Sequence, residues 1–237
     1  MKFPHCFVTG TDTDAGKTVA SASLLRYLAQ SGDSVAGMKP LASGFDRVGG
    51  ELINADIQML QSASSYKLPD ELVNQYGFVP AIAPHIAADF EGVEIDFDCV
   101  ANAVGIAKAR VDTLVVEGVG GWNVPLGICG ESGESACASH AQKDISALAN
   151  NLKLPIILVV GLRLGCLNHA LLTARAILAD GQPLLGWVAC AVTPDFECSN
   201  ENMRTLKQLM PARLLFEVPF LADELARRAY VPLSVNI

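Results

Sequence analysis

The chain has 237 residues, a formal net charge of −8, and a composition of 51% hydrophobic and 18% charged residues. This composition predicts a compact globular fold with a well-buried core and excludes a disordered chain. The acidic balance argues against nucleic acid as the main partner, because binding to a phosphate backbone requires clusters of Lys and Arg.

The cysteines and the apolar runs point to a cytoplasmic protein with no membrane partner. The seven cysteines are an odd number and no two form a C-x-x-C pair, which favours reduced thiols over disulfides or a zinc site. The N-terminal stretch MKFPHCF lacks the apolar core of a signal peptide. The longest apolar run, PIILVVGL, is too short to span a bilayer.

Short apolar runs alternate along the chain with segments of helical period. Phe7-Val8 predicts a first strand, and residues 17–30 predict a helix that Gly32 ends, because apolar residues there recur every three or four positions. Further strands are predicted at 34–40, 112–118, 155–161, 184–192 and 212–220. Further helices are predicted at 53–63, 97–110, 167–180 and 200–210.

This alternation predicts an α/β fold with a mainly parallel central sheet between helices. The strands at 112–118 and 155–161 are apolar on both faces, as parallel strands covered by helices are. No linker divides the chain, so residues 1–237 are expected to form one domain. Residues 126–142 are small, polar and rich in Gly and Ser, and predict a long mobile loop.

The stretch FVTGTDTDAGKT (7–18) indicates a phosphate-binding loop and hence a fold like that of P-loop NTPases, with three layers. Gly16-Lys17-Thr18 stands between a strand and a helix, where backbone N–H groups converge on phosphate oxygens. Lys17 would reach the β- and γ-phosphates, and the hydroxyl of Thr18 would bind Mg²⁺. The leading Gly10 is one residue early, since five residues rather than four separate it from Gly16.

Three charged residues near predicted strand ends or on a helix are further candidates. Glu117 ends an apolar strand and precedes GVGG, the position where parallel sheets hold their ligands. Asp56 lies in a predicted helix, where an isolated acid is usually only solvated. Lys39 follows a buried strand, and the sequence leaves open whether it meets a phosphate or is an exposed turn lysine.

Six segments in collinear order resemble those of the dethiobiotin synthase family. The most specific is the first, because the early glycine followed by Thr-Asp-Thr is that family's form of the loop. The segments are GTDTDAGKT (10–18), MKPLASG (38–44), NQYGFVPAIAPHIAA (74–88), VEGVGGWNVPL (116–126), GLRLGCLNHA (161–170) and GWVACAVTP (186–194).

The resemblance implies an ATP- and Mg²⁺-dependent ligase of biotin biosynthesis. CO₂ adds to one amine of 7,8-diaminononanoate, ATP phosphorylates the resulting carbamate to a carbamic–phosphoric anhydride, and the second amine closes the ureido ring. Such chemistry depends on positioning and charge neutralisation more than on a protein nucleophile.

The resemblance also implies a role for each matching position. The expected catalytic residues are Thr13, Lys17 and Lys39. The expected nucleotide-binding residues are Asp14, Ala15, Gly16, Lys17, Thr18, Val19, Asp56, Glu117, Gly118, Val119, Gly120, Cys190, Ala191, Pro219, Phe220 and Leu221. Mg²⁺ is expected at Thr18, Asp56 and Glu117. The expected substrate-binding residues are Thr13, Ser43, Gly165, Cys166, Leu167 and Asn168. In this family the stretch 165–168 comes from a second subunit, which implies a homodimer with the substrate site at its interface.

The chain departs from the family at three places. Cys190-Ala191 stands where relatives often carry Asn-Asp, and because cysteine hydrogen-bonds poorly, the preference for adenine is left open. The 126–142 segment is longer than the corresponding loop. Asp14 occupies a variable position, and its short side chain leaves open whether it contacts metal or substrate.

Three other functions compete with the ligase. A related ATP-dependent amide ligase would need a glutamine-hydrolysing domain, for which 237 residues leave little room. A switch ATPase of the ParA or MinD type usually has a lysine early in the loop, and GTDTDAG (10–16) has none. An inactive homologue is suggested only by Cys190-Ala191. Trp122 is either a core or a dimer residue, and His85 either shapes the site or makes a structural hydrogen bond.

Overall fold

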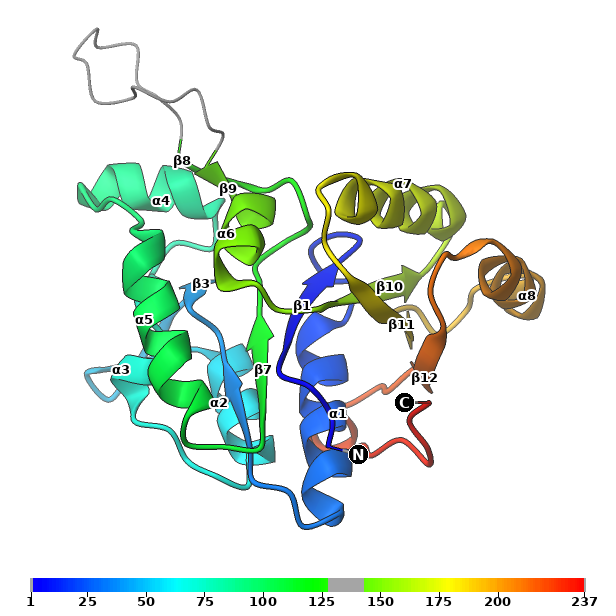
Figure 1. Cartoon of the computed structure of the whole chain (residues 1–237), viewed down its shortest axis with the longest axis horizontal. Coiled ribbons are helices and arrows are strands. Elements are labelled where there is room, and N and C mark those ends of the chain that lie inside the picture. The colour runs from blue at the N-terminus through cyan, green and yellow to red at the C-terminus, as the bar shows by residue number, and fades with distance from the viewer. Residues whose placement is uncertain (1, 128–142, 237) are drawn as a thin grey trace, which may run out of the picture.

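The computed structural model describes residues 2–127 and 143–236, and its centre is a six-stranded parallel sheet (Figure 1). The strand order is β12-β11-β10-β1-β7-β2. The six strands are β1 (Cys6–Gly10), β2 (Val35–Met38), β7 (Thr113–Glu117), β10 (Ile156–Leu162), β11 (Leu184–Ala191) and β12 (Leu214–Val218). Each coincides with a strand predicted from the sequence, and the predicted α/β fold is confirmed.

The longer helices were also predicted, whereas the short elements were not. The predicted helices are α1 (Lys17–Gln30), α2 (Ala55–Ala63), α5 (Phe97–Lys108), α7 (Cys166–Ala179) and α8 (Ser199–Leu209). The helices that the sequence did not reveal are α3 (Asp70–Val73), α4 (Pro84–Glu91), α6 (Ile145–Leu152) and α9 (Glu224–Ala229). The additional short strands are β3 (Leu41–Ser43), β4 (Asp46–Val48), β5 (Glu51–Ile53), β6 (Tyr76–Phe78), β8 (Pro125–Gly127) and β9 (Lys143–Asp144).

The predicted loop at 126–142 needs one correction. Residues 126–127 belong to β8, which pairs with β9 in an antiparallel ladder, so the loop does not begin at Leu126. Residues 128–142, which make up the rest of that prediction, lie outside the described residues.

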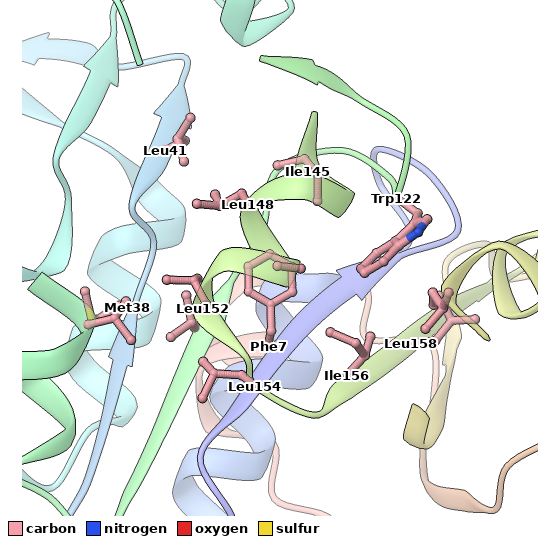
Figure 2. Packing of buried hydrophobic residues seen from close by; sticks show 14 of the residues in the cluster. Phe7, Met38, Leu41, Trp122, Ile145, Leu148, Leu152, Leu154, Ile156 and Leu158 are labelled. Atoms are coloured by element: carbon pink, nitrogen blue, oxygen red, sulfur yellow. The ribbon is translucent and has the colours of Figure 1, made fainter. Parts of the chain in front are cut away.

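Each face of the sheet packs on its own set of helices. Phe7 of β1 is fully buried and points toward Leu148 and Leu152, with Leu154 in the same cluster, on the face covered by α5, α6 and α7 (Figure 2). Its neighbour Val8 belongs to the cluster on the opposite face, where α1 and α2 pack. Alternate residues of a strand point to opposite faces, so one buried strand supplies both cores.

Trp122 is a core residue in the folded chain. It is only 3% exposed, packs in the same cluster as Ile156 and Leu158 (Figure 2), and its Nε1 donates a hydrogen bond to Asp180 Oδ2 at 2.6 Å. The sequence left open whether Trp122 is a core residue or a dimer contact, and its burial within the chain favours the core.

No helix within residues 2–127 and 143–236 is long and apolar enough to cross a membrane.

Candidate active site

A cavity of about 950 Å³ lies at the carboxyl ends of the parallel strands, where such sheets hold their ligands. Most of the residues predicted from the sequence line it. They are Thr13, Asp14, Gly16, Lys17, Thr18, Val19, Lys39, Ser43, Asp56, Val119, Gly120, Cys190, Ala191, Pro219, Phe220 and Leu221. Segments that are far apart in the sequence therefore meet at one site.

Three predicted nucleotide residues do not line the cavity. Ala15 of the loop between β1 and α1 is fully buried, and Glu117 is fully buried at the end of β7. A Cβ on Gly118 would come within 2.9 Å of the Phe7 ring, so this position requires glycine for close packing rather than for ligand contact.

The loop between β1 and α1 has the geometry of an anion-binding site. Gly16 is the N-cap of α1 with φ 88°, and no side chain caps the helix, so its first N–H groups remain available. Asp14 also adopts a left-handed conformation, with φ 57°. Lys17 is 7% exposed, and its Nζ donates to the carbonyl oxygen of Asp12 at 2.9 Å.

Lys39 is buried between two carboxylates. Its Nζ lies 2.5 Å from Asp56 Oδ2 and 2.7 Å from Glu117 Oε1, and the residue is only 5% exposed. The alternative that Lys39 is an exposed turn lysine is thus excluded. Asp56, which the residue pattern alone supported only weakly, is brought to the site by α2.

Burial and charge act on these groups in opposite directions. Desolvation is the largest influence on Lys39 and lowers its pKa, but Glu117 and Asp56 together outweigh it and raise the pKa to about 12. Desolvation also lowers the pKa of Lys17, and the attraction of the Glu117 carboxylate offsets only part of this effect. For Asp56, desolvation raises the pKa but the attraction of Lys39 prevails, so the pKa lies below its ordinary value.

The oxygen atoms beside Lys39 fit a hard divalent cation such as Mg²⁺. Thr18 Oγ1 donates to Glu117 Oε1 at 2.8 Å. Lys39 Nζ donates to both Asp56 Oδ2 and Glu117 Oε1, so the two carboxylates lie on either side of one ammonium group. Glu117 Oε2 is buried and has no hydrogen-bond partner in the part of the chain that the structure describes. A buried carboxylate oxygen without a donor is costly unless a cation or a ligand satisfies it.

The β2 side of the cavity offers further polar contacts. Ser43 Oγ is buried without a hydrogen-bond partner among residues 2–127 and 143–236, and Ser43 lines the cavity. Thr13 lines it from the phosphate loop. The Nδ1 atom of His85 lies 3.2 Å from the carbonyl oxygen of Pro125, which favours the structural role for this histidine.

The predicted substrate stretch 165–168 lies away from the cavity of its own chain. Gly165, with φ 94°, is the N-cap of α7, and no side chain caps this helix. None of Gly165, Cys166, Leu167 and Asn168 lines the cavity. Cys166 is buried, and burial raises the pKa of its thiol, so it is not an activated nucleophile.

The β11–β12 side of the cavity is mostly apolar and contains two charged residues that the sequence did not suggest. Cys190 and Ala191 end β11, and Phe220 follows β12. Glu224 and Arg227 of α9 line the same side. The signal for α9 was the N-cap Asp223, whose side chain accepts from Ala226 N, but a helix of six residues shows no clear period.

Burial makes Cys190 an unreactive thiol despite its place in the cavity wall. It is 4% exposed, and desolvation raises its pKa to about 12. At pH 8 we expect iodoacetamide to alkylate the exposed Cys99 and Cys198 at least tenfold faster than Cys190, because only the thiolate reacts. Peptide mapping by mass spectrometry measures this, with denatured protein as the control in which all three react. Equal rates in the native protein would contradict the assignment.

Comparisons with known proteins agree on one family. A sequence-family profile described as an AAA domain matches residues 5–227. A protein of Alteromonas mediterranea called ATP-dependent dethiobiotin synthetase BioD is 43% identical over 219 residues, covering 90% of this chain and 91% of that protein. A protein of the same name from Pseudomonas paraeruginosa is 45% identical over 221 residues, covering 93% and 91%.

Solved structures support the fold. The MinD cell division protein of Aquifex aeolicus matches with a TM-score of 0.54 and 13% identity, over 95% of this chain and 86% of that one. Its complex with MinC gives a TM-score of 0.55 and 14% identity, over 95% and 85%. At these identities the likeness shows only that the chain shares the fold of P-loop ATPases.

Proposed function

The chain belongs to the ATP-dependent dethiobiotin synthetase family, and on that premise we propose that it makes dethiobiotin from 7,8-diaminononanoate, CO₂ and ATP. The observation that carries the proposal is Lys39, a buried cation held between Asp56 and Glu117 beside the phosphate loop. A lysine that stays charged there neutralises a phosphoryl group in transfer.

The proposed reaction has three steps. One amine of the diamine attacks CO₂ and loses a proton, which gives a carbamate. The carbamate oxygen attacks the γ-phosphorus of ATP, the bond to the β-phosphate oxygen breaks, and ADP leaves. The second amine then attacks the carbamate carbonyl, loses its proton and expels inorganic phosphate, which closes the ureido ring.

The protein's part in these steps is positioning and charge. The N–H groups at the start of α1 and the ammonium of Lys17 hold the phosphates. Lys39, whose pKa of about 12 keeps it charged at neutral pH, faces the phosphoryl group as it moves to the carbamate. Thr13 and Ser43 hold the diamine, and the uncommitted Oγ of Ser43 supplies a donor for the carbamate.

Mg²⁺ would be held by Thr18, Asp56 and Glu117, and when bound it supplies positive charge that neutralises the phosphate oxygens. This donor set contains only oxygen, which suits a hard cation. Lys39 pairs with both carboxylates that would hold the metal, so its ammonium lies where it can neutralise the same phosphoryl group.

We further propose that the active unit is a cytoplasmic homodimer of one-domain subunits. The stretch 165–168 does not line the cavity of its own chain, and no side chain caps the start of α7, which supports its binding the diamine carboxylate at a partner's site. Residues from both halves of the chain form the cavity, which supports treating 1–237 as one domain.

A turnover assay tests the proposal. The protein is incubated with 7,8-diaminononanoate, bicarbonate, Mg²⁺ and a nucleoside triphosphate, and dethiobiotin is measured by mass spectrometry together with phosphate release. We expect one phosphate for each dethiobiotin formed. Absence of ring closure with every nucleoside triphosphate would overturn the proposal and favour an inactive homologue. Hydrolysis that does not depend on the diamine would favour a switch ATPase instead.

A further inference from the structure

The cavity has two sides that the strand order separates. The phosphate loop follows β1, with β7 and β2 on one side of it and β10, β11 and β12 on the other. Lys39 and Asp56 lie on the β2 side, where the γ-phosphate meets the carbamate in the proposed reaction. The base of the nucleotide then extends to the β11–β12 side. We call this side the base arm; it is lined by residues 190–192, 218–221, Glu224 and Arg227.

The base arm lacks the side chains that usually read a base edge. Among the described residues that line it, no side chain carries an amide, a hydroxyl or an imidazole group. Cys190 offers a weak, buried thiol. Glu224 is engaged elsewhere, because its Oε1 accepts from Arg228 Nε at 2.9 Å. Arg227 is thus the one cation lining this arm in the part of the chain that the structure describes.

A hydrogen bond holds the guanidinium of Arg227 against the wall of the arm. Its Nε donates to the carbonyl oxygen of Leu221 at 3.0 Å, and Leu221 is itself part of the arm's wall. Its charge lies near enough to Cys190 to lower the pKa of that thiol, although burial dominates and raises it. Within the described residues, its Nη atoms make no hydrogen bond or ion pair with another side chain.

We propose that Arg227 contacts the nucleotide base by stacking its guanidinium on the ring, and that this contact gives only a weak preference among bases. The inference rests on the proposed function for the place of the base, and it names the specificity-determining residue of that site. A guanidinium plane stacks on aromatic rings, and stacking tolerates any base because every base has a π-face. Among the described residues of the base arm no side-chain amide discriminates adenine, so we expect ATP, GTP, CTP and UTP all to enter.

Steady-state kinetics with the four nucleoside triphosphates test this inference. For the unaltered chain we expect KM values within about tenfold of one another. Arg227→Ala should raise KM for each nucleotide about fivefold to tenfold and leave kcat within about twofold, because base stacking is equally strong in the ground state and the transition state. Arg227→Lys should behave like Arg227→Ala, since lysine keeps the charge but lacks the plane.

Arg228→Ala is the matched control. Arg228 is the next residue of α9, is also a surface arginine, and pairs with Glu224 without lining the cavity. We expect its KM values to equal those of the unaltered chain. Any of four results would overturn the inference. They are an unchanged KM in Arg227→Ala, an equal rise of KM in Arg228→Ala, a return of KM to the unaltered value in Arg227→Lys, and strict dependence of turnover on ATP.

A binding measurement separates this inference from the proposed function. Titration calorimetry with Mg²⁺ and each nucleotide needs no diamine and no turnover. If the chain formed no dethiobiotin, a rise in Kd of about fivefold in Arg227→Ala but not in Arg228→Ala would still support the base contact. Equal Kd values in the two variants would overturn it.

Discussion

Replacement of Lys39 by Gln is expected to lower kcat/KM for dethiobiotin formation by about 10³-fold. Groups that neutralise a phosphoryl group in transfer contribute on this scale, and a neutral amide does not replace the ammonium. The loss should appear mainly in kcat, because the charge matters most when the γ-phosphoryl moves. Initial rates at saturating ATP and diamine measure it. A kcat within tenfold of the unaltered value would contradict the role given to Lys39.

Stability must be separated from catalysis in this variant. Lys39→Gln leaves the fully buried Glu117 without its cation, which costs about 3–5 kcal/mol for an ion pair broken on one side. The double variant Lys39→Gln with Glu117→Gln removes both charges, and we expect it to recover most of the melting temperature but none of the activity. Recovery of turnover together with stability would show that Lys39 is only structural.

The same pair predicts how stability depends on pH. The folded-state pKa of Lys39 is raised to about 12 from an ordinary 10.5, so its contribution is fully present below pH 10.5 and is lost as pH rises toward 12. Lys39 therefore stays charged throughout the neutral range. A decline in turnover between pH 7 and 9 would have to come from another group.

The central sheet was predictable because its strands are buried on both faces. The centre of the 112–118 run (residues 114–116) and the whole of the 155–161 run are apolar, and each run is the right length for one strand. The order of the strands was not predictable, since it depends on which crossover passes over which face. The helix α9 escaped prediction because none of its residues is buried, so that it has no apolar period to recognise.

The polar site was less predictable than the sheet, because its charges depend on contacts distant in sequence. Lys39 is 17 residues from Asp56 and 78 residues from Glu117, so a pattern of neighbours does not show that it is buried between them. Arg227 was missed for the same reason: it reaches the cavity only because α9 returns beside the end of β11. Family resemblance identified the positions that match a motif, and neither Glu224 nor Arg227 lies in one.

Replacement of Gly16 by Ala is expected to lower kcat/KM about 10²-fold or more and to destabilise the fold by about 1–2 kcal/mol. Gly16 has φ 88°, which costs a residue with a side chain about that much. An added Cβ would also overlap Sγ of Cys190 and lie 3.0 Å from its Cβ, so the loop must shift. Misplacement of a phosphate-binding loop by about 1 Å is enough to cost 10²-fold in rate.

Gly32→Ala isolates the backbone strain from the steric overlap. Gly32 has φ 85°, close to that of Gly16, but a Cβ there would have no atom within 4 Å. We expect it to lose similar stability in a denaturant titration while keeping kcat/KM within about twofold. Adding Cys190→Ala to Gly16→Ala removes the overlap with Sγ and should raise kcat/KM about tenfold above that of Gly16→Ala. The double variant keeps the backbone strain at position 16, so we do not expect it to recover the lost stability. If Gly32→Ala lost as much activity as Gly16→Ala, or if the double variant were no better than Gly16→Ala, the contact between the phosphate loop and β11 would not be what holds the loop in place.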